Sequence, residues 1–134
     1  MVQREFRAED AELQNAIAFV EEELEKLDCS MKAMMQITVC VEEMFINVAH
    51  YAYGGSPGTV ALTVDGENGV VSITLTDHGV PFDPLAKDDP DITLSAEERQ
   101  IGGLGIFMVK KSMDEVRYER RGQQNIFTMK KAIG

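Results

Sequence analysis

Glu43 and Asn47 are the two side chains whose types and spacing most readily suggest chemistry. They lie in residues 42–53, which we expect to form part of a helix over residues 30–53. At about 100° of rotation per residue, the carboxylate and the carboxamide stack one turn apart on the same side, with His50 beside them. The pair could build a site between this helix and neighbouring loops, although a solvated face is the better interpretation of the pair alone.

The other side of the same helix carries an apolar stripe, which is expected to face the core. Its residues follow the i, i+4, i+7, i+8, i+11 spacing of a buried helix surface. They are Ile37, Val41, Met44, Phe45 and Val48. This helix would therefore bury one face and present Glu43 and Asn47 from the other.

Asp77 is the next polar residue with a suggestive position. Residues 60–65 and 71–77 alternate in polarity around a turn at residues 66–69, which predicts a β-hairpin. Side chains alternate between the faces of a strand, so Asp77 shares the core-facing side with Leu75. A buried carboxylate is costly unless hydrogen bonds are donated to it. A plain strand-ending aspartate before the turn at His78 and Gly79 is the common alternative.

A glycine cluster follows a long irregular segment. Residues 83–101 contain two prolines and four aspartates, which predicts a lid-like loop with one helical turn at residues 95–100 and no calcium-loop spacing. Gly102, Gly103 and Gly105 then open a predicted helix over residues 106–113. Free amides at a helix start suit a phosphate cradle. The cluster is weak evidence alone, and it matches neither a P-loop nor a dinucleotide fingerprint.

Length and composition bound the class of protein. We expect residues 1–134 to form one domain, with 44% hydrophobic residues and a net charge of −10. This charge argues against nucleic acid and anionic membranes as partners. Cys29 and Cys40 are interpreted as reduced thiols. No run approaches about 20 apolar residues, so a cytoplasmic location is expected.

The remaining segments complete an α+β pattern. Residues 2–8 predict a short edge strand, and residues 11–27 an amphipathic helix with Asp10 as N-cap and a solvated acidic run at residues 21–23. Ser30 is expected to cap the second helix. Residues 116–120 and 126–129 predict a second hairpin. Together they indicate a mostly antiparallel sheet covered on one face by helices.

The order of these features resembles the GHKL nucleotide-binding fold of gyrase, heat-shock ATPase chaperones, mismatch-repair ATPases and histidine kinases. Glu43-x-x-x-Asn47 matches its N box, Asp77-x-Gly79 its first glycine box and Gly103-x-Gly105 its second. The resemblance covers essentially the whole chain, and it implies a two-layer α/β sandwich with an ATP lid at residues 83–101.

Within that superfamily the chain is most similar to the small anti-sigma-factor serine/threonine kinases of bacterial partner-switching systems. The similarity is carried by Ala52-Tyr53, by Pro81-Phe82-Asp83 and by residues 102–114. Such relatives bind Mg-ATP, phosphorylate a small antagonist protein and sequester a sigma factor, and the resemblance also implies a possible homodimer.

The resemblance implies a role for each polar residue of the boxes. Asp77 would accept a hydrogen bond from the amino group of adenine, and Gly79 would let the backbone pass close to the base. Asn47 would contact Mg²⁺ that already carries phosphate oxygens, which suits a hard cation. Glu43 would take the proton of the attacking hydroxyl.

The glycine-rich segment would hold the phosphates. The resemblance assigns the backbone of Gly102, Gly103, Leu104 and Gly105 to ATP binding, and it suggests that Arg99 reaches the γ-phosphate when the lid closes. Two departures concern the finer contacts. Tyr51 stands where the family more often has a histidine, and Asn125 stands where the superfamily has a threonine near adenine.

Two alternatives to an ATP-dependent serine/threonine kinase remain open. The chain could be a nucleotide-dependent module that sequesters its partner without phosphorylating it, or the ATPase domain of a larger machine. The intact Glu43/Asn47 pair favours the kinase over the first. With only His50 and His78 present, a phosphoacceptor-histidine helix is absent, which excludes a complete sensor histidine kinase.

Overall fold

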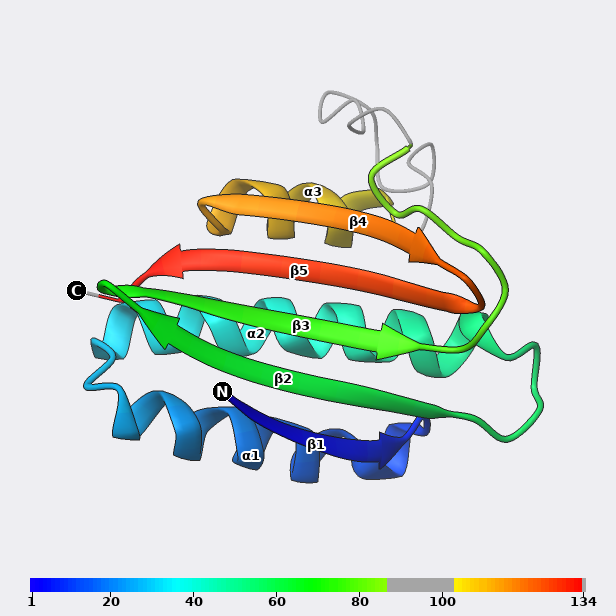
Figure 1. Ribbon diagram of the computed structural model, residues 1–134, viewed down its shortest axis with the longest axis horizontal. Coiled ribbons are helices and arrows are strands. Elements are labelled where there is room, and N and C mark those ends of the chain that lie inside the picture. The colour runs from blue at the N-terminus through cyan, green and yellow to red at the C-terminus, as the bar shows by residue number, and fades with distance from the viewer. Residues whose placement is uncertain (87–102, 134) are drawn as a thin grey trace.

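The computed structural model describes residues 1–86 and 103–133, and it has two layers (Figure 1). One layer is a five-stranded sheet with the order β1-β2-β3-β5-β4, in which every pair is antiparallel. The strands are β1 (Val2–Arg7), β2 (Thr59–Glu67), β3 (Val70–Asp77), β4 (Glu115–Arg121) and β5 (Gln124–Ala132). The predicted mostly antiparallel α+β fold is confirmed.

In the described residues, the second layer consists of three α-helices on one face of the sheet. They are α1 (Leu13–Lys26), α2 (Met31–Asn47) and α3 (Gly103–Ser112). Helix α2 contacts both of the others, so it is the central helix of this layer (Figure 1). The predicted segment at residues 83–101 lies largely outside the described residues.

The core forms between the two layers. Helix α2 buries four members of its predicted apolar stripe, and Val48 is half-buried. These four are Ile37, Val41, Met44 and Phe45. They pack in one cluster with the inward-facing residues of the central strands, which include Leu62, Ile73, Leu75 and Met129.

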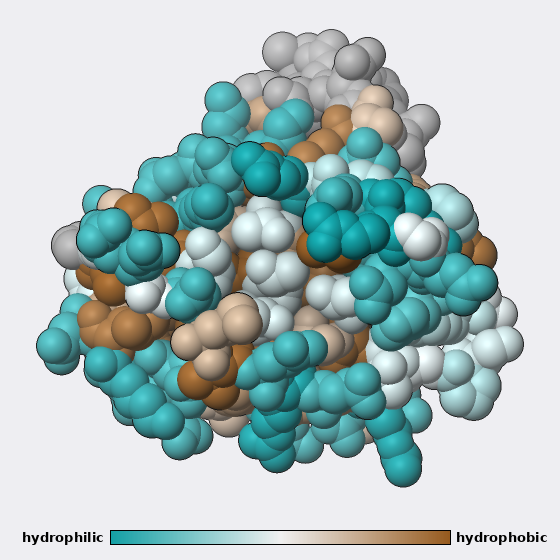
Figure 2. Space-filling view, viewed as in Figure 1, coloured by the Kyte–Doolittle hydropathy of each residue, from teal (hydrophilic) through white to brown (hydrophobic). Residues whose placement is uncertain are grey.

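The other face of the sheet carries no helix in the described part of the chain. Its side chains come from the alternate positions of the same strands, and on the central strands many of them are hydroxyls, such as Thr63, Thr74 and Thr128. Figure 2 shows this face as a pale central band with hydrophilic side chains around it. The hydroxyl oxygens of Thr74 on β3 and Thr128 on β5 lie 3.3 Å apart, within hydrogen-bonding distance.

The start of α1 differs from the prediction. Asp10 begins a short 3₁₀ turn (Asp10–Glu12), and it does not act as N-cap. Its carboxylate instead lies 2.7 Å from Nε2 of His50. The side chain is therefore used in a contact between two segments, 40 residues apart, that the local sequence pattern does not reveal.

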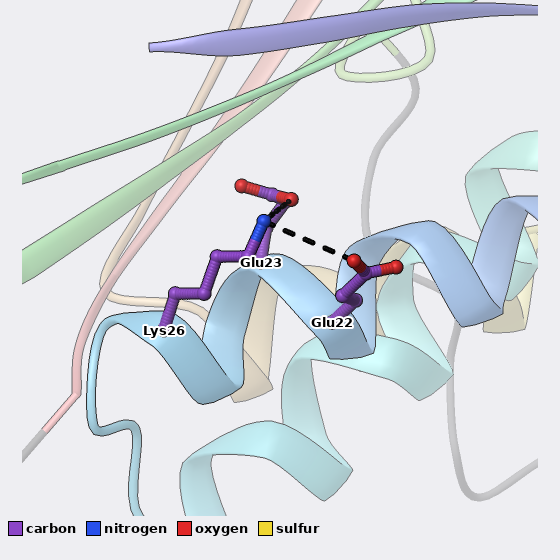
Figure 3. Close-up of polar contacts among 3 residues, drawn as sticks. All are labelled: Glu22, Glu23 and Lys26. Carbon is purple, nitrogen blue, oxygen red and sulfur yellow. Dashed lines mark hydrogen bonds and ion pairs between the residues drawn. The ribbon is translucent and has the colours of Figure 1, made fainter.

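The predicted solvated acidic run is wrong at Glu23, which is only 8% exposed. Nζ of Lys26 lies 3.0 Å from the Glu23 carboxylate and 3.8 Å from that of Glu22. Figure 3 shows Lys26 reaching both carboxylates. The hydrogen bond to Glu23 raises the pKa of Lys26. A lysine one turn later thus supplies the partner that a nearly buried carboxylate needs.

Helix α2 begins as predicted and ends differently. The Ser30 hydroxyl accepts a hydrogen bond from the amide of Ala33 at 3.2 Å, which confirms Ser30 as the N-cap. After Asn47 the chain continues as a π-helix, η2 (Val48–Ala52), so the predicted helix over residues 30–53 changes its winding at Asn47. Such wide turns are frequent at functional sites.

Candidate functional site

A largely apolar cavity lies between the end of α2 and the adjoining ends of β3 and β5. It is lined by α2, η2, β3, β4, β5 and the loop that follows β3. The lining residues are Met44, Asn47, Val48, Tyr51, Ala52, Leu75, Asp77, Val80, Phe82, Pro84, Tyr118, Asn125 and Phe127. Asn47 lines this cavity together with Met44 and Val48, two residues of the predicted apolar stripe, so the predicted placement of Asn47 on the opposite side of the helix is corrected.

Asp77 is the buried acidic residue of this cavity. It ends β3 and is 5% exposed, as the strand alternation predicted. Its Oδ1 accepts hydrogen bonds from the backbone amide of Gly79 at 2.8 Å and from Nδ2 of Asn125 at 2.9 Å. Within residues 1–86 and 103–133 no hydrogen bond reaches Oδ2. One buried carboxylate oxygen is therefore left to accept a donor from a ligand.

Gly79 permits a close approach between the loop after β3 and η2. A Cβ atom at this position would overlap the carbonyl oxygen of Ala52. The next amide, that of Val80, donates to the same oxygen at 2.9 Å. The Tyr53 hydroxyl accepts from the amide of His78 at 2.9 Å, so two contacts tie the loop to the end of η2. Gly79 is required here by protein packing, whether or not a base also lies close.

Glu43 lies one turn before Asn47 and faces the start of α3. A Cβ atom added to Gly105 would overlap Oε2 of Glu43 and would lie 2.8 Å from its Cδ. The N box and the second glycine box therefore meet in space. A carboxylate at the N-terminal end of a helix is also electrostatically favourable, because the helix dipole is positive there.

The glycine cluster differs in detail from the prediction. Helix α3 begins at Gly103, so Gly103, Leu104 and Gly105 form its first turn and are not a loop before it. The first turn of a helix has backbone amides without intrahelical partners, and such amides suit the binding of an anion. Arg99 and Gly102 lie outside the described residues.

His50 does not join Glu43 and Asn47, contrary to the expected position. It is exposed and lies against Asp10.

Cys40 lies near Glu43 and is fully buried. Burial raises the pKa of its thiol, and the charge of Glu43 raises it further. Within the described ranges no group of three or more His, Cys, Asp or Glu residues could hold a metal ion. A metal here would rely on few protein ligands, of which Asn47 is the candidate.

Sequence reasoning placed Asn125 near the adenine position and missed its neighbours on β4. The Tyr118 hydroxyl donates to Oδ1 of Asn125 at 2.5 Å. Nη1 of Arg120 donates to the carbonyl oxygen of Gly79 at 2.8 Å. Both residues share the inward-facing parity of β4, and that parity is the signal that could have found them.

Comparisons with known proteins show the family of the chain. The profile of the family described as "Histidine kinase-like ATPase domain" matches residues 6–131. The chain is 28% identical over 101 residues to the serine/threonine-protein kinase BtrW of Bordetella bronchiseptica, covering 75% of this chain and 71% of that protein. It is 29% identical over 92 residues to the anti-sigma F factor of Geobacillus kaustophilus, covering 68% and 63%.

Solved structures show the same fold. A Mycobacterium tuberculosis protein with RsbU and RsbW domains matches with a TM-score of 0.64 at 14% identity, over 99% of this chain and 33% of that one. The SiaB-SiaC complex of Pseudomonas aeruginosa matches with a TM-score of 0.59 at 15% identity, over 98% and 89%. At these identities the two matches show the fold alone.

The chain belongs to the histidine kinase-like ATPase domain family. The GHKL resemblance is thereby confirmed, and the relatives include a kinase and anti-sigma F factors. The chain spans less than two thirds of the anti-sigma F factor that it matches. No helix in the described residues has the length and hydrophobicity needed to cross a membrane.

Proposed function

We propose that this chain is an ATP-dependent serine/threonine protein kinase of the anti-sigma-factor type. It would bind Mg-ATP and phosphorylate a small antagonist protein in the cytoplasm, and it would sequester a sigma factor as a homodimer. The observation that carries the proposal is the meeting of the boxes. Asp77 and Asn47 line one cavity, and Glu43 lies on α2 one turn before Asn47, against Gly105 in the first turn of α3.

The base would occupy the apolar cavity. Oδ2 of Asp77, which has no partner in the described part of the chain, would accept a hydrogen bond from the 6-amino group of adenine. Leu75 and Phe127, which are register partners on β3 and β5, would lie side by side against the ring and give it an apolar surface. The cavity residues present therefore fit an aminopurine.

The phosphates would extend from the cavity towards the start of α3. The first-turn amides from Gly103 to Gly105 would bind phosphate oxygens, together with Gly102 and Arg99, which lie outside the described residues. Asn47 would donate its carboxamide oxygen to Mg²⁺. When bound, the ion would neutralise part of the phosphate charge.

Glu43 would act on the attacking hydroxyl. Its carboxylate would take the proton of a serine or threonine of the antagonist as the oxygen forms its bond to the γ-phosphorus. The bond between that phosphorus and the β–γ bridging oxygen would break, and ADP would leave. Gly105 gives this carboxylate its space, since any larger side chain would displace it.

The test is a phosphotransfer assay with γ-labelled ATP, Mg²⁺ and a candidate antagonist protein. Glu43→Gln is compared with Glu42→Gln, its neighbour on the exposed face of α2. Acid-stable label on the antagonist that is lost only in Glu43→Gln would support the kinase. ATP binding without label would favour the module that sequesters its partner without phosphorylation. ATP hydrolysis without a phosphoprotein would favour an ATPase domain of a larger machine, and no ATP binding would refute all three.

A further inference from the structure

Asn125 occupies a central place at the inner end of the cavity. It is 6% exposed, lies on β5 and is the register partner of Asp77 on β3. The side chain of Tyr118 on the edge strand β4 reaches the same amide from the other side. The Asn125 carboxamide on β5 therefore links Tyr118 on β4 to Asp77 on β3.

All four hydrogen-bonding positions of this carboxamide are used. Oδ1 accepts from the Tyr118 hydroxyl at 2.5 Å and from the amide of Phe82 at 3.4 Å. Nδ2 donates to Oδ1 of Asp77 at 2.9 Å and to the carbonyl oxygen of Val80 at 2.8 Å. An asparagine side chain offers two donors and two acceptor positions, so no capacity is left over.

The network fixes which way the amide faces. A half-turn of the Asn125 amide would place its oxygen against the Asp77 carboxylate and the Val80 carbonyl, which are both acceptors. It would also place its NH₂ group against the Phe82 amide, which is a donor. The Tyr118 hydroxyl donates to Oδ1 and stabilises the side chain in the observed orientation.

The orientation of the Asn125 amide determines which oxygen of the Asp77 carboxylate is free to accept a hydrogen bond from a ligand. With Nδ2 of Asn125 and the amide of Gly79 both on Oδ1, that oxygen is saturated, and Oδ2 is the acceptor left for a ligand. Arg120, also on β4, holds the carbonyl of Gly79 at 2.8 Å. The edge strand therefore supports the aspartate and the glycine of the same box.

We propose that Tyr118 and Asn125 are positioning residues that set the base selectivity of the nucleotide site. They hold Asp77 so that Oδ2 faces the 6-position of a bound purine. A 6-amino group donates to this oxygen, whereas the 6-oxo group of guanine presents a second acceptor and is repelled. The inference rests on the proposed binding of ATP, and it concerns selectivity and not phosphoryl transfer.

The experiment compares ATP with purine riboside triphosphate, which lacks only the 6-amino group. Dissociation constants of both are measured by titration calorimetry for the wild type, Tyr118→Phe and Asn125→Leu. The wild type is expected to prefer ATP by about tenfold or more, the range of one hydrogen bond to a charged group. Tyr118→Phe is expected to reduce that preference about threefold to tenfold, and Asn125→Leu is expected to reduce it further. Both variants should act mainly by weakening the binding of ATP.

Thr74→Val is the matched control. It also removes a hydroxyl that meets a side chain of β5, but on the uncovered face of the sheet. Its preference for ATP should equal that of the wild type. A variant at residue 118 or 125 that weakens both nucleotides by the same factor would show a merely structural role and overturn the inference.

The failures are distinguishable. Suppose that the wild type prefers ATP, and that Tyr118→Phe and Asn125→Leu are shown by circular dichroism to be folded and keep the full preference. This result overturns the present inference alone. A wild type that binds both nucleotides equally overturns the assignment of Oδ2 as the reader of the amino group. A wild type that binds neither refutes the proposed function itself.

Discussion

Replacing Gly79 by alanine gives the sharpest test of the packing around the cavity. The added Cβ would overlap the carbonyl oxygen of Ala52 and would lie 2.6 Å from its carbonyl carbon and its Cβ. These atoms are mostly backbone, so no side-chain rotation can relieve the overlap. The loop or η2 must move, and the hydrogen bond from Val80 to the same oxygen, 2.9 Å long, is lost or weakened.

The size of the effect follows from these two losses. Overpacking costs about 1–3 kcal/mol. A lost hydrogen bond costs roughly 1 kcal/mol. Gly79→Ala should therefore lower the free energy of unfolding by about 2–4 kcal/mol, a large share of the roughly 5–15 kcal/mol of a typical domain. With an m-value of about 2 kcal/mol/M, the urea midpoint falls by about 1–2 M.

Urea unfolding followed by circular dichroism measures this loss. Gly105→Ala is the control, because the atoms nearest to its Cβ are those of the carboxylate end of Glu43, which can rotate away. Alanine in a helix is also favoured over glycine by up to about 1 kcal/mol. A Gly79→Ala variant as stable as Gly105→Ala would refute the argument that backbone contact with Ala52 is the reason for glycine.

Three further predictions concern the site and the core. Gly105→Ala should keep its stability yet lower phosphotransfer by about tenfold or more in the γ-labelled ATP assay, because Glu43 is displaced. Asp77→Asn should keep an acceptor for Gly79 and lose the one for adenine, so calorimetry should show ATP affinity about tenfold to a hundredfold lower with the fold intact. Burial raises the pKa of Cys40 above its usual 9.0, so the folded state holds the thiol proton more tightly. The contribution of this thiol to the free energy of unfolding is fully present below its usual pKa and is lost as the pH rises through its raised pKa in the folded state. The difference in the free energy of unfolding between the wild type and Cys40→Ala, measured by urea unfolding, should therefore narrow above about pH 9.

Periodicity was enough to predict the fold class and one buried carboxylate. The strand alternation from Val71 to Asp77 placed Asp77 on the core side, and the structure confirms it. The apolar stripe of α2 was equally readable, since helical spacing alone selects Ile37, Val41 and Phe45. These are local signals, repeated along one element.

The remaining features depend on residues far apart in the sequence. Asn125 meets Asp77 across 48 residues, and Asp10 meets His50 across 40, so neither contact leaves a trace in the local pattern. The change to a π-helix after Asn47 likewise belongs to the packing of η2 against the loop after β3. The roles of Glu43 and Asn47 remain predictions, although Glu43 now has a position against Gly105.

The place of β5 in the sheet has a consequence for how the protein matures. β5 follows all other described elements along the chain, yet it lies between β3 and β4 and supplies Asn125 to Asp77. During synthesis, β4 emerges from the ribosome before the strand that connects it to the sheet. Nucleotide recognition should therefore arise late and all at once, and a chain that stops before Gln124 would lack an interior strand of its sheet, not merely an edge.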